Sequence, residues 1–473
     1  MKVLLTGSTG YIGRRLKQKL LADKNINLRL FVRNKKSLSS NMKKDVEVIE
    51  GDTFNKGSLR KALEGVDVAF YLIHSLNRSD YKNLDKISAQ NFVEIAKECG
   101  VKKIIYLGGL GVKNDDTSEH LLSRLETGEV LCQEEGIQTI WIRAGVIIGS
   151  GSTSFEIIRN LTEKLPVMTT PKWVFTKAQP IAVDDVLSYL QESIYLDTKD
   201  NLIVDIGTQQ LTYKDMMIQT GKALGLKRVI IPLPFLSINL SSYWLNLFTP
   251  VPFQVAKALI EGLKSEVVIQ NDNALKYFPN IKPMPFIEAV KKAVEEIETN
   301  QVISRWSDNA GKIWEKDHSK EIADAIFIDR KEMDISNLDK EKVFKSFINI
   351  GGEHGWFDYD FLWELRGILD KLIGGVGLKR GRRSQDELRV GESLDFWKVV
   401  DIKQNERLLL FAQMKVPGSA WLEFKIKDNK LIQSAYFYPK GVFGRLYWYA
   451  LIPLHYFVFT NMIESIVKKA STK

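Results

Sequence analysis

Cysteine and histidine are scarce in this sequence, with two of the former and five of the latter among 473 residues. Cys99 and Cys132 are too few for a disulfide framework, so we expect a reducing, cytoplasmic compartment. The histidines show no ligand spacing with one another or with cysteine, and we therefore assign no metal site. The start, MKVLLTG, leaves no room for the long apolar core of a signal peptide, which disfavours export.

Basic residues are not clustered along the sequence, although the net charge is +9. Lys and Arg are spread along the chain without zinc-finger spacing, a helix-turn-helix signal or an RNP-like aromatic motif, so we expect no nucleic acid partner. The densest basic segment, Lys379 to Arg383, favours a solvated loop, with a phosphate or an acidic lipid head group as the alternative.

Strand-like and helical segments alternate along the first part of the chain. Strands are predicted at residues 2–6, 28–32, 46–50, 68–73, 104–107 and 139–143, with a helix at Tyr11–Leu21. Parallel neighbours need a crossover between them, so this alternation predicts an α/β fold of the Rossmann type, a doubly wound parallel sheet. Residues 151–298 are less regular, and we expect them to form a small substrate lobe of the same domain, 1–298.

The rest of the chain has a different pattern. Residues 299–320 are polar and predicted to be a linker. A second domain, 321–473, is expected to be α+β, with Asp339 or Asn337 capping its first helix. Its predicted elements are a strand at 325–335, a helix at 339–350, strands at 394–402, 407–415, 421–427 and 431–438, and a helix at about 442–469.

The first strand runs directly into the segment Gly7-Ser8-Thr9-Gly10-Tyr11-Ile12-Gly13. Glycines at this spacing permit a tight turn, close approach of the backbone to a pyrophosphate, and close packing of helix on strand. The following helix would present its free N–H groups to the phosphates. Because the turn follows a strand and opens a helix, we expect it to bind a nicotinamide dinucleotide.

Arg33 lies just beyond the second strand, where NAD-selective sites usually have an acidic side chain. A guanidinium there favours the 2′-phosphate of NADP, with NAD as the alternative, and a merely solvated basic loop is also open. We expect Asp52 and Thr53 to lie against the adenine, unless they only form a turn or helix cap. Leu72-Ile73-His74 end the fourth strand and should flank the nicotinamide ribose.

Several segments of the first part of the chain, with Arg33, carry a family resemblance. They are TGSTGYIG, EGD, AFYLIHS, KKIIYLGGLG, WIRAGVIIGSGS and PIAVDDV. They resemble the atypical and extended short-chain dehydrogenase/reductase superfamily, particularly its NmrA-like and isoflavone-reductase-like members. The whole chain is similar to a bacterial two-domain group in which such a domain precedes a helix-grip (START-like, polyketide-cyclase-like) domain of unknown function. That second resemblance is carried by IGGEHGW, LWELRGILDKLIGG, LKRGRR, GESLDFWKVV and the closing aromatic helix.

The resemblance implies a catalytic Tyr-x-x-x-Lys pair and a serine, and here the sequence departs from it. His120 and Arg124 stand where the tyrosine and lysine should fall, and Gly108-Gly109 where the serine should. His120 would donate a proton while Arg124 holds the ribose. The alternative for His120 is an exposed residue without a role near the helix start.

The resemblance also implies an apolar ligand cavity in the second domain, lined by aromatic residues that would equally build an ordinary core. Residues 446–463 contain no charged side chain, and we expect the helix at 442–469 to pack on its own sheet, with peripheral membrane contact as the alternative. Two functions follow. One is an NADP(H)-dependent oxidoreductase acting on an apolar carbonyl or enone; the other is a non-catalytic regulator like NmrA or an assembly subunit similar to the nucleotide-binding accessory subunit of respiratory complex I.

Overall fold

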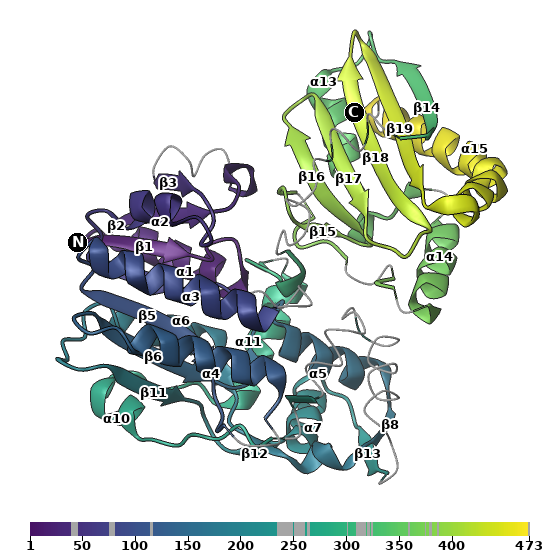
Figure 1. Ribbon diagram of the computed structural model, residues 1–473. Coiled ribbons are helices and arrows are strands. Elements are labelled where there is room, and N and C mark those ends of the chain that lie inside the picture. Colours follow the sequence, from purple (N-terminus) through teal and green to yellow (C-terminus); the bar gives the residue numbers. More distant parts are fainter. Residues whose placement is uncertain are drawn as a thin grey trace. The chain divides into compact units, whose positions relative to one another are not determined.

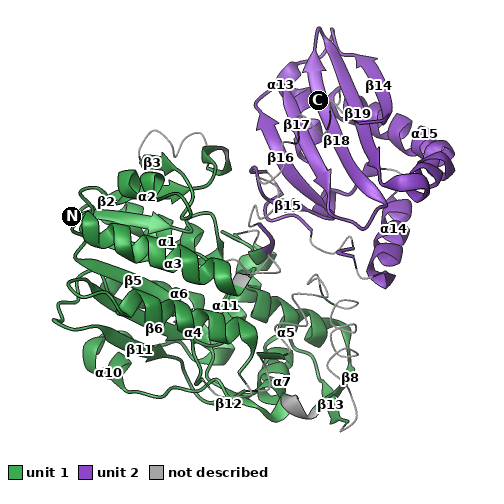
Figure 2. Cartoon of the chain, viewed as in Figure 1, with its two compact units in different colours: residues 1–306 green, residues 307–473 purple. Residues whose placement is uncertain are grey.

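A computed structural model gives the fold of the chain. It describes residues 1–38, 46–74, 81–113, 117–233, 249, 261–262, 265–299, 301–308, 318, 322, 325–357, 360–373, 375–377, 381–385 and 387–471. These divide into two compact units, 1–306 and 307–473 (Figure 2). The boundary falls inside the segment 299–320 expected to be a linker, of which 309–317 and 319–320 lie outside the described residues.

The first unit is built on a seven-stranded sheet in the order β11-β6-β5-β4-β1-β2-β3, and every pair of neighbours is parallel (Figure 1). This confirms the predicted doubly wound sheet, because parallel pairing requires the helical crossovers that the sequence indicated. The strands are β1 (Lys2–Thr6), β2 (Asn27–Val32), β3 (Glu47–Glu50), β4 (Val68–Tyr71), β5 (Lys103–Gly109), β6 (Gln138–Ala144) and β11 (Leu202–Ile206).

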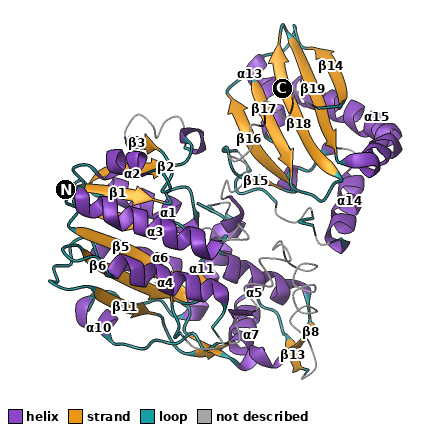
Figure 3. Ribbon diagram, in the orientation of Figure 1, coloured by secondary structure: helices purple, strands orange, loops and turns teal. Residues whose placement is uncertain are grey.

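Helices cover both faces of this sheet (Figure 3). Side chains of a strand alternate between faces, so Val3 and Leu5 join one core while Leu4 joins the other. The first core includes helices α1 (Tyr11–Ala22) and α6 (Val183–Glu192). The second includes α2 (Lys56–Leu63), α3 (Tyr81–Glu98) and α4 (Glu119–Cys132).

The lobe after residue 144 has three small two-stranded sheets, in which β7 pairs with β10, β9 with β12 and β8 with β13. A separate apolar core holds it together. The expected lobe is therefore a mixed α/β region; residues 234–248 and 250–260, with Pro234, Pro250 and Pro252, lie outside the described residues. Its elements are β7 (Ile147–Ile148), α5 (Thr153–Lys164), β8 (Val167–Thr170), β9 (Lys177–Ala178), β10 (Ile181–Ala182), β12 (Leu211–Thr212), α7 (Tyr213–Ala223), β13 (Val229–Pro232), α10 (Asn273–Tyr277) and α11 (Phe286–Glu298).

The second unit is a six-stranded antiparallel sheet in the order β14-β19-β18-β17-β16-β15, with helices packed against it. This α+β arrangement confirms the predicted class of the second domain. Its strands are β14 (Phe327–Asp334), β15 (Ser393–Leu394), β16 (Trp397–Lys403), β17 (Arg407–Ala412), β18 (Gly418–Lys427) and β19 (Lys430–Pro439), and its helices α13 (Lys340–Ile348), α14 (Asp360–Leu372) and α15 (Gly441–Ser471).

Local residues explain two features of this unit, a helix cap that the sequence predicted and a tight turn between two strands. Asp339 caps α13 by accepting the Glu341 amide at 2.8 Å. Asp428 and Asn429 both take positive φ, 50° and 57°, which makes the two-residue hairpin between β18 and β19. The strand expected at 394–402 is instead a hairpin of β15 and β16, because Asp395 takes a φ of 52° and turns the chain.

Two arginines of the basic segment Lys379 to Arg383 contradict both expectations for it, because they are buried. Arg383 is buried and pairs with buried Glu392 at 2.6 Å. Arg382 is buried too, and its Nη1 donates to the carbonyls of Ile348 and Ile350. These two arginines are internal parts of the domain, so they form neither a solvated loop nor a phosphate site; Lys379 and Arg380 lie outside the described residues.

Candidate functional site

The glycine turn after β1 is shaped by packing at two of its three glycines. Gly7 has a φ of 65°, and a Cβ there would lie 2.3 Å from the Leu72 carbonyl oxygen. A Cβ on Gly13 would lie 2.2 Å from the Gly7 carbonyl oxygen. Gly10 is different, because a Cβ there would meet only the Gly7 oxygen within 4 Å, at 3.3 Å, among the described residues. Its missing side chain leaves space above the turn.

The turn and the start of α1 fit a bound pyrophosphate. Gly10 caps α1 without a side-chain hydrogen bond, so the first-turn amides of Tyr11, Ile12 and Gly13 have no side-chain cap. The Ser8 hydroxyl is buried and has no hydrogen-bond partner in the described part of the chain. Open space, uncapped amides and an unpaired hydroxyl are what an anionic group at a helix N-terminus requires. Thr9 lies in the same turn, and its carbonyl accepts from Arg14 Nε at 2.8 Å.

Arg15, on the same helix, is buried and bonded to other residues of the unit. Its Nη2 donates to the Ser150 hydroxyl at 2.7 Å and pairs with Glu296 of α11 at 3.2 Å. The side chain is buried, and the centre of the Tyr11 ring lies 5.3 Å from its guanidinium carbon. Arg15 therefore binds the lobe to α1, and its charge is used inside the unit.

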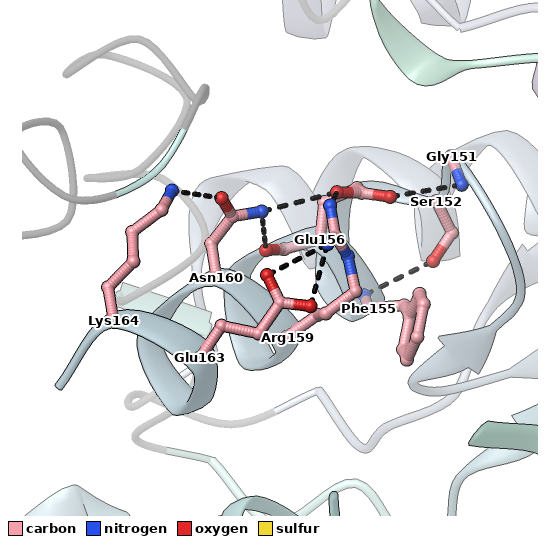
Figure 4. A network of polar contacts seen from close by, with 8 residues as sticks. All are labelled: Gly151, Ser152, Phe155, Glu156, Arg159, Asn160, Glu163 and Lys164. Atoms are coloured by element: carbon pink, nitrogen blue, oxygen red, sulfur yellow. Dashed lines mark hydrogen bonds and ion pairs between the residues drawn. The ribbon is translucent and has the colours of Figure 1, made fainter. Parts of the chain in front are cut away.

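The segment that holds Ser150 is fixed by the first turns of α5 (Figure 4). Ser152 caps the helix by accepting the Phe155 amide at 3.2 Å, and Glu156 accepts the Gly151 amide at 3.3 Å. Arg159 in turn pairs with Glu156 at 2.8 Å. This network, continued by Asn160, Glu163 and Lys164, holds the chain that leads from the sheet into the lobe.

Arg33 follows β2 and is exposed. Within the described residues it makes no hydrogen bond or ion pair, whereas Arg15 is bound to Ser150 and Glu296. The guanidinium of Arg33 is thus available to an anion beside the carboxyl end of β2, and its contact with a 2′-phosphate stays a prediction.

Asp52 and Thr53 follow β3 and form a turn. Asp52 Oδ1 accepts the Phe54 amide at 3.1 Å, which is the turn alternative left open by the sequence. Thr53 is buried, and its hydroxyl accepts from Ser88 of α3 at 2.7 Å. Both residues shape the loop beside the glycine turn, while their contact with the adenine stays a prediction.

Leu72, Ile73 and His74 continue from β4 at the carboxyl edge of the sheet. The Leu72 amide donates to the Thr6 hydroxyl at 3.1 Å, which holds this segment against the end of β1. Leu72 and Ile73 are partly buried in the two cores on either side of the sheet. The segment therefore lies next to the glycine turn, where the resemblance expects the nicotinamide ribose.

His74 and His120 are in direct contact. His74 Nε2 lies 3.1 Å from His120 Nδ1, and His74 Nδ1 lies 2.6 Å from Asp85 Oδ2 of α3. A carboxylate only accepts hydrogen bonds, so His74 carries its proton on Nδ1 and accepts at Nε2 from His120 Nδ1–H. Ser123 also donates to Asp85, at 3.1 Å. When its ring is neutral, His120 consequently has its lone pair on Nε2.

Both imidazoles are kept neutral by their surroundings. Burial lowers the pKa of His74, although Asp85 opposes this effect. Burial lowers the pKa of His120 further, with Arg124 and His74 adding to the shift. His120 is therefore partly buried and hydrogen-bonded, not the exposed residue that was the alternative for this position.

The strand end opposite His120 has no room for the missing serine. A Cβ on Gly109 would lie 2.5 Å from the Leu121 side chain, and one on Gly108 would lie 2.3 Å from the Trp141 indole nitrogen. The same Cβ on Gly109 would lie 3.4 Å from Cδ of Arg124. The Nε of Arg124 is buried and has no hydrogen-bond partner among the described residues. The glycines are thus required by packing, and the buried nitrogen of Arg124 can bind a ligand.

The sequence missed the contact between His74 and His120 because they are 46 residues apart. One available signal was that His74 follows β4 and His120 begins the helix after β5. Adjacent parallel strands bring their carboxyl ends to one edge of the sheet, so the two histidines could have been expected to meet. Nothing in the sequence pattern singled out Asp85.

Two family models match the chain. Residues 7–159 match the NAD(P)H-binding family, and residues 322–462 match a protein family of unknown function (DUF2867). The family match agrees with the parallel sheet and the glycine turn, which make the first unit an NAD(P)-binding domain with a Rossmann-type fold. The chain combines this domain with a C-terminal domain of the DUF2867 family.

Curated relatives are similar over part of the chain. Sterol demethylase protein B of Methylococcus capsulatus is 28% identical over 116 residues, 24% of this chain and 35% of that protein. (4-Alkanoyl-5-oxo-2,5-dihydrofuran-3-yl)methyl phosphate reductase of Streptomyces griseus is 24% identical over 171 residues, 35% of this chain and 57% of that protein. The chain thus spans about a third to somewhat over half of the length of these relatives.

Among solved structures, triphenylmethane reductase of Citrobacter sp. complexed with NADP(H) is similar with a TM-score of 0.50. It is 22% identical, and the match covers 62% of this chain and all of that one. The likeness supports the fold of the first unit.

Proposed function

We propose that the chain is an NADP(H)-dependent oxidoreductase in which His120 is the acid/base residue. The observation that carries the proposal is the chain of hydrogen bonds from Asp85 through His74 to His120, placed where the resemblance expects the catalytic tyrosine. An imidazole backed by a second imidazole and a carboxylate has a fixed tautomer and a fixed orientation, which general acid/base catalysis requires.

The direction of proton movement follows from the tautomers. His120 Nε2 accepts the hydroxyl proton when an alcohol is oxidised, and the protonated ring returns it to the oxygen when a carbonyl is reduced. The nicotinamide, when bound, supplies or accepts the hydride. His74 and Asp85 act as positioning residues, and Arg124 binds the ribose through its unpaired guanidinium nitrogen.

Arg33 selects NADP over NAD in this proposal. It is exposed, has no partner within the described residues and follows β2, where a 2′-phosphate would lie. The substrate class is an apolar carbonyl or enone. A relative is named as reductase of a (5-oxo-2,5-dihydrofuran-3-yl)methyl phosphate. Its ring contains an alkene conjugated to a carbonyl, which supports the enone, while its phosphate gives no support for an apolar substrate.

A second candidate is a non-catalytic NADP-binding regulator or assembly subunit. It is favoured by the filled space at Gly108 and Gly109, since no hydroxyl from β5 can assist His120 in orienting a carbonyl. In that function the cofactor turn and Arg33 are used, and His120 has a structural role.

Turnover with NADPH across a panel of apolar ketones and enones separates the two. We expect a substrate-dependent loss of reduced-nicotinamide absorbance that His120→Ala lowers by about 10²- to 10⁴-fold, with NADPH affinity unchanged. His354→Ala, which changes an exposed histidine of the second unit, is the matched control. NADPH binding without turnover of any panel member would reject the enzyme in favour of the regulator, whereas full turnover by His120→Ala would reject His120 as the acid/base residue.

A further inference from the structure

Helix α15 has two halves with opposite surroundings. Its C-terminal half belongs to the core of the second unit, where Phe459, Met462 and Ile466 are buried against the sheet. The helix is long and apolar enough to cross a membrane. The core helix of a soluble protein meets the same two criteria. Because the C-terminal half of the uncharged stretch is packed in the core, the helix cannot span a bilayer without breaking that core.

The N-terminal half exposes an apolar face. Gly444 and Trp448 face inward, and Trp448 stacks on Phe327 and Phe437 of the sheet. The other side of the helix is formed by large apolar side chains that are each at least 40% exposed. They are Val442, Phe443, Leu446, Tyr449, Ile452, Leu454, Tyr456 and Phe457.

Helix α14 belongs to the same unit (Figure 1), and its exposed apolar residues add a second apolar face. Its Trp363 packs near Phe459 of α15, with ring centroids 6.5 Å apart, so the two helices are neighbours. The exposed residues recur at helical spacing and are each at least half exposed. They are Phe361, Leu365, Ile368, Leu369, Leu372 and Ile373.

We propose that α14 and the N-terminal half of α15 form a docking surface for a lipid bilayer. So many large apolar side chains on adjacent helices exceed the small patches that soluble monomers expose. Tyr449 and Tyr456 have an apolar ring with a polar end, which suits the boundary between head groups and acyl chains.

The charges around the surface fit anionic head groups. Between Asp428 and Glu464 the chain has no acidic residue, while Lys440 and Arg445 are exposed beside the apolar face. Lys331 borders it as well, with its Nζ 4.9 Å from the centre of the Tyr456 ring, but it is paired with Asp329 at 3.3 Å and adds no net charge. Asp360 and Glu364 are exposed acidic residues of α14. The helices would therefore lie in the interface with the basic residues toward the head groups.

The test is co-sedimentation of the full chain with vesicles of phosphatidylcholine alone or with phosphatidylglycerol added. We expect the chain to bind, more tightly with phosphatidylglycerol. The double variant Phe443→Asp/Phe457→Asp should bind at least about tenfold more weakly, because two side chains lose their transfer into the apolar layer. Leu275→Asp in the first unit changes a side chain that is 77% exposed and should bind like the unchanged protein.

Three results would overturn the proposal. The chain could stay in the supernatant with both vesicle compositions, or the double variant could bind as well as the parent. Alternatively, the parent could be a dimer that the double variant converts to a monomer, which would assign the face to a second copy. Phe443 and Phe457 are 82% and 59% exposed, so an unchanged melting temperature for both variants will show that lost binding is not lost folding.

Discussion

The rings of His74 and His120 stack with their centroids 4.9 Å apart and their planes inclined by 16°. One follows a strand of the parallel sheet and the other begins the helix after the next strand, so the fold itself creates the pair. With Asp85 behind His74, the contact turns two isolated histidines of the sequence into one hydrogen-bonded unit at the carboxyl edge of the sheet.

Replacing Arg33 by alanine should weaken NADPH binding and leave NADH binding nearly unchanged. A charge-assisted hydrogen bond to a 2′-phosphate contributes about 1.5–3 kcal/mol, which corresponds to roughly 10- to 100-fold in affinity. Lys24→Ala removes another exposed basic side chain of the same unit and serves as the control. Fluorescence titration of both variants checks this, and equal losses for NADPH and NADH would contradict it.

Changing Gly10 to alanine should affect NADPH binding, whereas changing Gly13 to alanine should affect stability. The Cβ of Gly10→Ala would enter the space above the turn, so we expect lost NADPH binding with little change in melting temperature. Gly13→Ala forces a carbon to within 2.2 Å of a backbone oxygen and should destabilise the first unit by about 1–3 kcal/mol. Thermal melts with and without NADPH measure both effects. Normal binding by Gly10→Ala would show that the pyrophosphate does not use this space.

Acid should destabilise the first unit through the histidine pair. The folded-state pKa values of His74 and His120 lie below the usual value, so the fold favours their neutral forms. Below about pH 6.5 the unfolded chain binds protons that the folded chain does not, and each histidine then lowers stability by up to about 1.4 kcal/mol per pH unit. The full contribution is present above that pH.

The double variant His74→Gln/His120→Gln should therefore lose less stability than the parent between neutral and mildly acidic pH. Melting temperatures across that range provide the measurement. An identical pH dependence in the two proteins would mean that the pair does not titrate as the structure indicates.

Removing Glu392 should damage the second unit, because Arg383 would be left buried without its main partner. We expect Glu392→Ala to cost about 3 kcal/mol of stability. Glu406→Ala breaks a pair in which both side chains are about half exposed and should cost less than about 1 kcal/mol. Denaturant unfolding compares the two, and similar small losses would show that the buried pair is unimportant.

The sheet of the first unit could be predicted because its signals are local. The segment 2–6 is apolar and ends in glycines, and the observed strand has the same bounds. The helix predicted at Tyr11–Leu21 is one residue longer in the structure, since no glycine or proline stops it earlier. The cap at Asp339 and the turn at Asp428-Asn429 were local signals as well.

The partners of charged side chains could not be predicted in this way. Arg15 and Glu296 are 281 residues apart, and no local signal in the sequence pairs Arg383 with Glu392. Sequence pattern therefore assigned Arg383 to a solvated loop or a phosphate site, although tertiary packing buries it. His74 was predicted as a neighbour of the ribose, but its hydrogen bond to His120 depends on the order of the strands.

The most direct test of the account is calorimetric titration of the full chain with NADPH and with NADH. We predict one site per chain, with NADPH bound at least about tenfold more tightly because of Arg33. Absence of binding heat with both dinucleotides, or equal affinity for the two, would contradict the site described above.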